Sequence, residues 1–308
     1  MIRNPVLKFM GNNMFEGFEI GHATANGVGI HFRKGGDGPP LLLLHGYPET
    51  HVMWHKIAPE LAQKFTVVAA DLRGYGDSDK PSSGEEHIGY SKRTLAQDQV
   101  ELMAGLGFED FFLVGHDRGS RVAHRMVLDN PQRVRRVVML DTIPVDTAFE
   151  NVNADLATAW FHWFLMRRPE PFPETMIGAN VEFYMRHLLG SWSTVPDAFT
   201  DEAFAEYLRC FEKPETIHAS CEEYRAITLD LKHHAVDRDK QVSCPLLALW
   251  GGSRDTHPGW STNVVDPLTA WRERCEDAHG RPLDCGHFLP EERPEETLQE
   301  ILFFLAEA

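Results

Sequence analysis

Apolar and polar positions along most of the chain follow two periods, one typical of strands and one typical of helices. Continuous or period-two apolar runs predict strands near residues 17–23, 28–34, 40–44, 65–71, 111–116, 134–141, 245–251 and 281–285. From residue 40 onward, helical spacing predicts helices near 54–63, 92–106, 120–130, 266–277 and 294–306. An early hairpin followed by alternating strands and helices predicts an α/β fold with an eight-stranded, mostly parallel, doubly wound sheet.

This alternation stops between about residues 145 and 240. Aromatic side chains recur there at helical spacing, and prolines interrupt the segment. No run in it suits a buried strand. We therefore expect a helical lid inserted after the sixth strand. Residues 1–144 and 241–308 would then form a core domain, and residues 145–240 a helical cap domain.

The candidate chemistry begins at residues 115–119, which have the sequence Gly-His-Asp-Arg-Gly where a buried strand gives way to a helical pattern. This is the form of a nucleophile elbow, a sharp turn that presents one side chain above the sheet. The flanking glycines fit because a Cβ would clash in so tight a turn. At its tip, the Asp117 carboxylate would attack a saturated carbon and leave an ester, whereas a serine would form an acyl-enzyme. The motif therefore favours dehalogenase or epoxide hydrolase chemistry over esterase chemistry.

Partners for this nucleophile are expected at the ends of other strands. The turn His45-Gly46-Tyr47-Pro48 follows the third strand, so the backbone N–H groups of Tyr47 and Arg118 could form an oxyanion hole. His287 follows the last strand and is the expected base that activates water. Either Asp141, at the end of the sixth strand, or Asp255, after the seventh, could orient it.

Composition narrows the choice of partners. The formal charge is −16, from 30 basic and 46 acidic residues. This argues against nucleic acid and anionic membrane surfaces, so an anionic substrate would have to be held by a few local arginines. Five cysteines without a CxxC pair predict reduced thiols, and neither a disulfide framework nor a zinc site. Without a secretory pattern or an apolar run of about 20 residues, we expect a cytoplasmic protein that has no membrane partner.

From the HGYP turn through the elbow to the GHFLPEERPEET segment, the chain resembles the fluoroacetate (haloacetate) dehalogenases of the α/β-hydrolase superfamily. The resemblance implies that Arg118 and Arg121, three residues apart at the elbow, bind the substrate carboxylate. It also implies halide binding by His162 and Trp163 in the WFHWF segment and by Tyr224 in the CEEYR segment. From the residues alone, packing within the lid is the favoured interpretation of His162 and Trp163, and only the resemblance favours halide binding.

Three further consequences follow from this resemblance. It favours Asp141 over Asp255 as the acid, although the Gly-Ser-Arg-Asp run at 252–255 has the form of the acid position in other α/β-hydrolases. It implies a small anionic substrate. Because relatives are often dimers through the lid, it also leaves a homodimer open.

The sequence supports three functional hypotheses. The first is hydrolytic dehalogenation of a short 2-haloacid, of the fluoroacetate or chloroacetate class, with no metal or organic cofactor. The second is an epoxide hydrolase that uses the same aspartate and histidine. The third is a catalytically silent binder of small molecules, against which the complete set of nucleophile, base and oxyanion turn argues.

Overall fold

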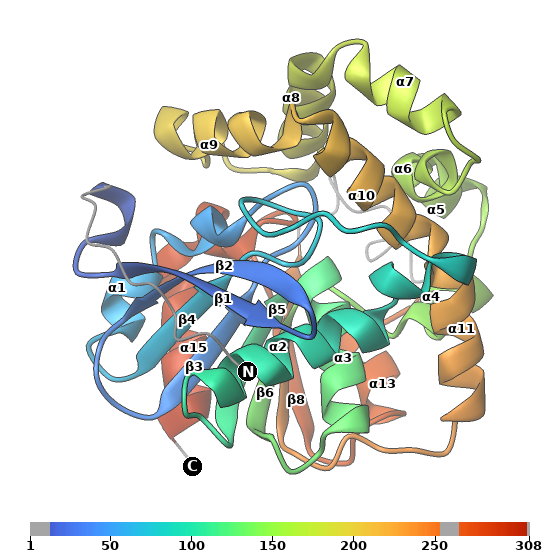
Figure 1. Cartoon of the computed structure of the whole chain (residues 1–308). Coiled ribbons are helices and arrows are strands. Elements are labelled where there is room, and N and C mark those ends of the chain that lie inside the picture. Colours follow the sequence, from blue (N-terminus) through green and yellow to red (C-terminus); the bar gives the residue numbers. More distant parts are fainter. Residues whose placement is uncertain (1–12, 253–264, 307–308) are drawn as a thin grey trace.

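The computed structural model describes residues 13–252 and 265–306, and within them one sheet runs through the core (Figure 1). Its strand order is β1-β2-β4-β3-β5-β6-β7-β8. The strands are β1 (Glu19–Ala25), β2 (Val28–Gly35), β3 (Pro40–Leu44), β4 (Thr66–Ala70), β5 (Phe111–His116), β6 (Val134–Leu140), β7 (Leu246–Gly251) and β8 (Ala278–Leu283). The β1–β2 and β2–β4 pairs are antiparallel and the remaining pairs are parallel, which confirms the predicted fold class.

The central parallel strands are buried on both faces, which explains why their sequences read as continuous apolar runs. Leu41–Leu44 and all of β4 and β5 are buried. Strand β8 lies instead at the edge and carries Gly280, Arg281 and Pro282. Its hydrophobic pattern is therefore weak, and the prediction of a strand at 281–285 was displaced by three residues at its start.

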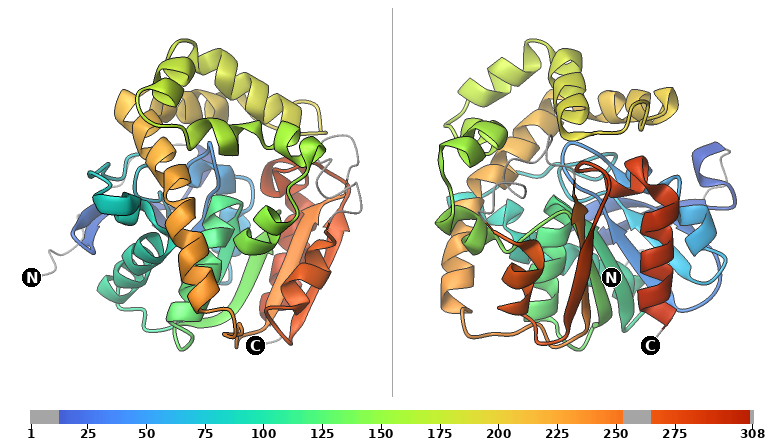
Figure 2. Two further views of the ribbon diagram at one scale, coloured as in Figure 1. Left: turned by 90° about the vertical axis from the view of Figure 1, so that its right-hand side faces the viewer. Right: turned by 180° about the vertical axis from the view of Figure 1, so that it is seen from behind.

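Helices cover both faces of the sheet, with α2 and α3 on one side and α1 and α15 on the other (Figures 1 and 2). The core helices are α1 (Ala58–Leu61), α2 (Lys92–Gly105), α3 (Arg118–Asp129), α13 (Pro267–Arg272), α14 (Leu289–Glu292) and α15 (Pro294–Ala306), and the 3₁₀ turns are η1 (Asn13–Phe15), η2 (His51–Trp54) and η3 (Glu85–Tyr90). The predictions for α2, α3 and α15 hold to within two residues.

Two predicted core helices are shorter than expected. The one predicted at 54–63 is divided between η2 and α1, whose start carries Pro59, a residue that suits the first turn of a helix. The one predicted at 266–277 ends at Arg272.

Between β6 and β7 the chain forms a group of helices, most of which lie above the carboxyl ends of the parallel strands, while the last one runs down beside the core (Figures 1 and 2). They are α4 (Val145–Glu150), α5 (Ala154–Ala159), α6 (Phe161–Met166), α7 (Phe172–Gly178), α8 (Val181–Trp192), α9 (Asp201–Phe211), α10 (Pro214–Arg225) and α11 (Ile227–Val236). We call this segment the cap. None of the helices in the described parts of the chain has the length and apolar character that a membrane crossing requires.

Candidate active site

The turn between β5 and α3 holds the predicted nucleophile in a strained backbone conformation. Asp117 has φ 43° and ψ −109°, which costs a non-glycine residue about 1–3 kcal/mol. Two glycines make this geometry possible: a Cβ on Gly119 would lie 2.2 Å from the Leu44 carbonyl oxygen, and one on Gly115 2.7 Å from the Gly119 backbone. The tight packing of α3 against β3 depends on glycine at position 119, and that against β5 on glycine at position 115.

The Asp117 carboxylate is buried but remains ionised. Burial alone would raise its pKa, and the nearby charges of His287 and Arg118, with smaller effects of His116 and Arg121, lower it below the ordinary value. The backbone N–H of Tyr47 donates a hydrogen bond to Oδ2 over 3.1 Å. Residue 46 must be glycine for this approach, because a Cβ there would lie 2.8 Å from the Asp117 Cβ.

His287 and Asp141 form the second part of the site. The His287 Nδ1 lies 2.6 Å from Oδ2 of Asp141, whose Oδ1 accepts the Gly251 N–H over 2.8 Å. Burial lowers the pKa of His287, but the hydrogen bond and the charge of Asp141, together with the charge of Asp117, outweigh burial, and the net shift is upward. The sequence offered two acids, Asp141 and Asp255, as the partner of this histidine, and the structure places Asp141 beside it. Asp255 lies outside the described residues.

Both arginines predicted to bind a carboxylate are buried beside the elbow. The Arg118 Nε donates to Glu223 over 2.9 Å, while Nη1 and Nη2 are buried without a hydrogen-bond partner. The Arg121 Nη1 donates to the Ile143 carbonyl over 3.2 Å, and within the described residues Arg121 has no carboxylate partner. Burial, followed by repulsion from Arg118, lowers the pKa of Arg121 to about 10. These two neighbouring cations with unused donors can accept an anion.

Aromatic residues of the cap close the site above the arginines. The Arg121 Cζ lies 4.6 Å from the Trp163 ring centre, and the Arg118 Cζ lies 4.2 Å from that of Tyr224. The His162 ring stacks on Tyr47 at 5.8 Å, and its centre lies 5.6 Å from that of Tyr224. The structure thus brings all three residues predicted to bind halide together over the elbow.

Two of these cap residues carry buried polar atoms without partners. They are His162 Nδ1 and the Tyr224 hydroxyl. Burial lowers the pKa of His162 to about 3 and raises that of Tyr224 well above its usual range, so both are neutral at pH 7. Neutral N–H and O–H groups that are buried and have no protein partner can donate to a small anion or to a ligand oxygen.

Comparison with known proteins shows the family to which the chain belongs. A family model described as the alpha/beta hydrolase fold matches residues 39–294. The chain belongs to the α/β-hydrolase family. The chain resembles a fluoroacetate dehalogenase from Burkholderia sp, with 43% identity over 297 residues and 96% of each chain covered. It also resembles a soluble epoxide hydrolase from Corynebacterium sp. (strain C12), with 35% identity over 94% of this chain and 98% of that one.

A solved structure gives the same result at the level of the fold. A candidate α/β hydrolase from Nostoc sp PCC 7120 has 52% sequence identity and a TM-score of 0.91, over 94% of this chain and 99% of that chain. The family, with its dehalogenase-like members, agrees with the resemblance drawn from the sequence. Family membership supports hydrolase activity, while the relatives include enzymes named for two different substrates.

The sequence did not point to three buried carboxylates that lie at the site of this α/β-hydrolase. Glu223 accepts from Arg118; Glu292 accepts backbone N–H groups on both sides of His287; and Glu49 lies 3.5 Å from His116. Burial, and then repulsion from Glu291 and Asp117, raises the pKa of Glu49 well above its usual range. Each lies beside a residue that the sequence singled out, but acids are common on surfaces, and only the fold shows that these three are buried.

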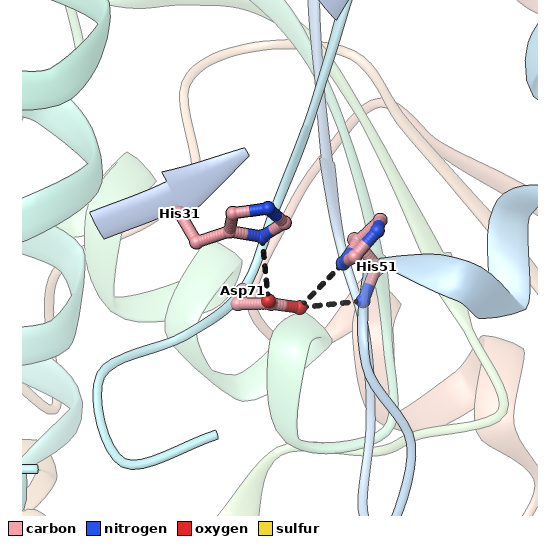
Figure 3. A group of neighbouring side chains, drawn as sticks. All are labelled: His31, His51 and Asp71. Carbon is pink, nitrogen blue, oxygen red and sulfur yellow. Dashed lines mark hydrogen bonds and ion pairs between the residues drawn. The ribbon is translucent and has the colours of Figure 1, made fainter. Parts of the chain in front are cut away.

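One group of side chains has the residue types of a metal site, but its carboxylate oxygens already accept hydrogen bonds from the protein. The imidazoles of His31 and His51 converge on Asp71 (Figure 3). Asp71 receives four N–H groups: both Nδ1 atoms at 2.9 Å, the His51 backbone at 2.8 Å and the Asp77 backbone at 3.0 Å. The carboxylate is fully used as an acceptor, so we interpret the cluster as a hydrogen-bond network that holds the loop after β4.

Proposed function

We propose that this α/β-hydrolase removes halide hydrolytically from short 2-haloacids of the fluoroacetate or chloroacetate class. One observation carries the proposal: two buried arginines beside the nucleophile keep guanidinium N–H groups without protein partners. Arg118 and Arg121 can bind a carboxylate through these groups and so aim the adjacent carbon at Asp117. The similarity to a fluoroacetate dehalogenase supports this reading.

In the first step, a carboxylate oxygen of Asp117 forms a bond to the carbon that carries the halogen, and the carbon–halogen bond breaks. The electron pair leaves with the halide. Neutral donors from His162, Trp163 and Tyr224 would stabilise the developing anion, which matters most for fluoride. The product is an ester between Asp117 and the 2-carbon of the acid.

In the second step, a water molecule attacks the ester carbonyl of Asp117. His287 takes the proton from this water, and Asp141 stabilises the imidazolium that forms. The oxygen that receives the Tyr47 N–H hydrogen bond would become the oxyanion, and the backbone N–H of Arg118 would be its second donor. Collapse of this intermediate breaks the bond between the Asp117 carbonyl carbon and the ester oxygen, and the departing alkoxide takes the proton from His287. This restores the Asp117 carboxylate and the neutral imidazole and releases the 2-hydroxy acid.

Halide release tests the proposal directly. With fluoroacetate and chloroacetate as substrates, a fluoride or chloride electrode should record turnover that yields glycolate. Arg121→Ala should lower kcat/KM for chloroacetate by about 10²-fold or more, because a bidentate hydrogen bond is lost in a buried site. The same change should leave a neutral epoxide nearly unaffected. Equal losses on both substrates would remove the argument for carboxylate binding.

Epoxide hydrolysis is the second candidate, because the unpartnered Tyr224 hydroxyl and His162 Nδ1 could also donate to an epoxide oxygen. The similarity to a soluble epoxide hydrolase supports it. Styrene oxide distinguishes the two functions. Diol formation from styrene oxide without halide release from either haloacid would favour the second candidate.

A further inference from the structure

Glu223 joins the cap to the core directly behind the proposed carboxylate site. It lies near the end of α10, which crosses from the cap toward the core (Figure 1). Its side chain is fully buried and accepts from three core residues: Arg118 Nε at 2.9 Å, the Tyr75 hydroxyl at 2.7 Å, and Lys92 Nζ. Burial would raise the pKa of Glu223, but Arg118 and Lys92 lower it to about 2, so the group is an anion.

The hydrogen bond to Glu223 decides which edge of Arg118 is free. Because Nε is engaged, the guanidinium plane is fixed and Nη1 and Nη2 remain buried without a partner. The ring of Tyr224, the next residue on α10, packs on the face of the same guanidinium, with 4.2 Å between its centre and Cζ. Two consecutive residues of α10 therefore hold the Arg118 guanidinium: Glu223 through a hydrogen bond to its Nε, and Tyr224 by packing on its face.

We propose that Glu223 is a positioning residue for substrate specificity: it orients Arg118 so that the two free guanidinium nitrogens face the substrate carboxylate. This inference rests on the proposed function, because it assigns Glu223 to the acid-binding part of that site. Glu223 itself does not contact the substrate. It acts through Arg118, whose η nitrogens make the proposed contact.

The sign of the effect separates positioning from simple electrostatics. Replacing Glu223 by glutamine removes one negative charge beside the site. Charge alone would then make the site more positive and strengthen the binding of an anion. Loss of orientation has the opposite effect, because Arg118 could turn away and its bidentate geometry would be lost. Weaker acid binding by this variant is therefore opposite to the direct effect of the removed charge and supports positioning.

The experiment measures binding and turnover separately. Calorimetry with acetate, an unreactive carboxylate, should show that Glu223→Gln raises Kd about 10-fold or more, by loss of one oriented charge-assisted contact. The kcat/KM for chloroacetate should fall by a similar factor, mostly through KM, while that for neutral chloroacetamide changes less than about threefold.

Glu222→Gln is the matched control. Glu222 is the preceding residue on the same helix and is also buried and ion-paired, but its partners are Arg225 and His87, at 2.6 Å each. This control should leave acetate affinity unchanged. Should Glu223→Gln fail to fold because Lys92 loses its counterion, the double change Lys92→Met/Glu223→Gln removes both charges and should show the same loss.

The outcomes separate the inference from the function on which it rests. Unchanged or tighter acetate binding in a folded Glu223 variant, with an active wild type, overturns the positioning role alone. An equal loss on chloroacetate and chloroacetamide overturns it as well. A wild-type chain that neither binds acetate nor releases halide overturns the proposed function and this inference together.

Discussion

At the scale of single residues, the site is defined by which side chains carry charge and which do not. Asp117 remains an anion because cationic groups outweigh the cost of its burial. Tyr224 and His162 remain neutral because burial disfavours their charged forms. Burial thus keeps the donors neutral, while the neighbouring cationic groups keep the nucleophile ionised, as displacement of a halide requires.

The nucleophile can be identified by isotope labelling. In single turnover of chloroacetate in water enriched in ¹⁸O, we expect the label to enter the Asp117 side chain, because water attacks the carbonyl of the ester and not the carbon of the acid. Mass spectrometry of the peptide that contains residue 117 measures this. Label found only in glycolate after one turnover would contradict the ester mechanism. Asp117→Asn should abolish halide release.

The pH dependence of kcat should reflect the raised pKa of His287. A base is inactive while protonated, so kcat falls as pH drops through this pKa. Asp141→Asn removes the carboxylate that raises the pKa, and the acid limb should move to lower pH. The rate at neutral pH should also fall, by about 10²–10⁴-fold, because the imidazole loses its orienting partner. An acid limb that remains in place would contradict this assignment.

At the scale of elements, the loop after β8 is held by α14, whose last residue is Glu292, and by the segment of the cap that follows α8. The Glu292 carboxylate accepts the N–H groups of Gly286 and Phe288, both at 2.9 Å, and those of Thr194 at 2.8 Å and Val195 at 3.2 Å. The His287 N–H donates to the Trp192 carbonyl over 2.8 Å. A single carboxylate therefore connects the loop of the proposed base to the cap.

Glu292→Gln should destabilise the protein and slow turnover together. The amide nitrogen of glutamine would face backbone N–H groups, and charge-assisted hydrogen bonds would be lost, so we expect about 2–3 kcal/mol of lost stability. Chemical denaturation and kcat measure the two effects. Glu295→Gln is the control, since Glu295 is exposed at the start of α15 and its substitution should change stability by about 0.5 kcal/mol or less.

At the scale of the whole molecule, the proposed site lies between two layers joined by buried polar contacts. Glu223 connects α10 to Lys92 on α2 and to Arg118 on α3. The hydroxyl of Tyr47 donates to that of Tyr184 on α8 over 2.9 Å. A ligand that satisfies the free guanidinium groups would therefore stabilise cap and core as one unit.

Thermal unfolding tests this coupling. Acetate at about 100 times its Kd should stabilise the folded state by about 2.7 kcal/mol, because it binds the folded chain and not the unfolded one. The Tm should rise by several degrees. Acetamide at the same concentration and ionic strength has the same shape without the charge, and it should leave Tm unchanged. Equal shifts with both compounds would contradict an anion site.

The sequence alone determined the sheet and the position of the nucleophile, for a local physical reason. Strands buried on both faces must be continuously apolar, and a tight elbow needs glycines at 115 and 119. Both features depend on residues that are neighbours in the sequence, so the sequence alone reveals them. The predicted bounds of strand β8 were wrong because an edge strand with Gly280 and Pro282 has little apolar pattern. The resemblance to a family, rather than any periodicity, pointed to the cap residues.

Only the tertiary structure decided how distant segments combine. It paired His287 with Asp141, 146 residues away, and buried Glu223 against Arg118, 105 residues away. No local pattern distinguishes an acid such as Glu223 from the many on the surface, because its burial depends on how the cap packs on the core. The long-range contacts thus determine which charges are buried together, and hence which chemistry the elbow can perform.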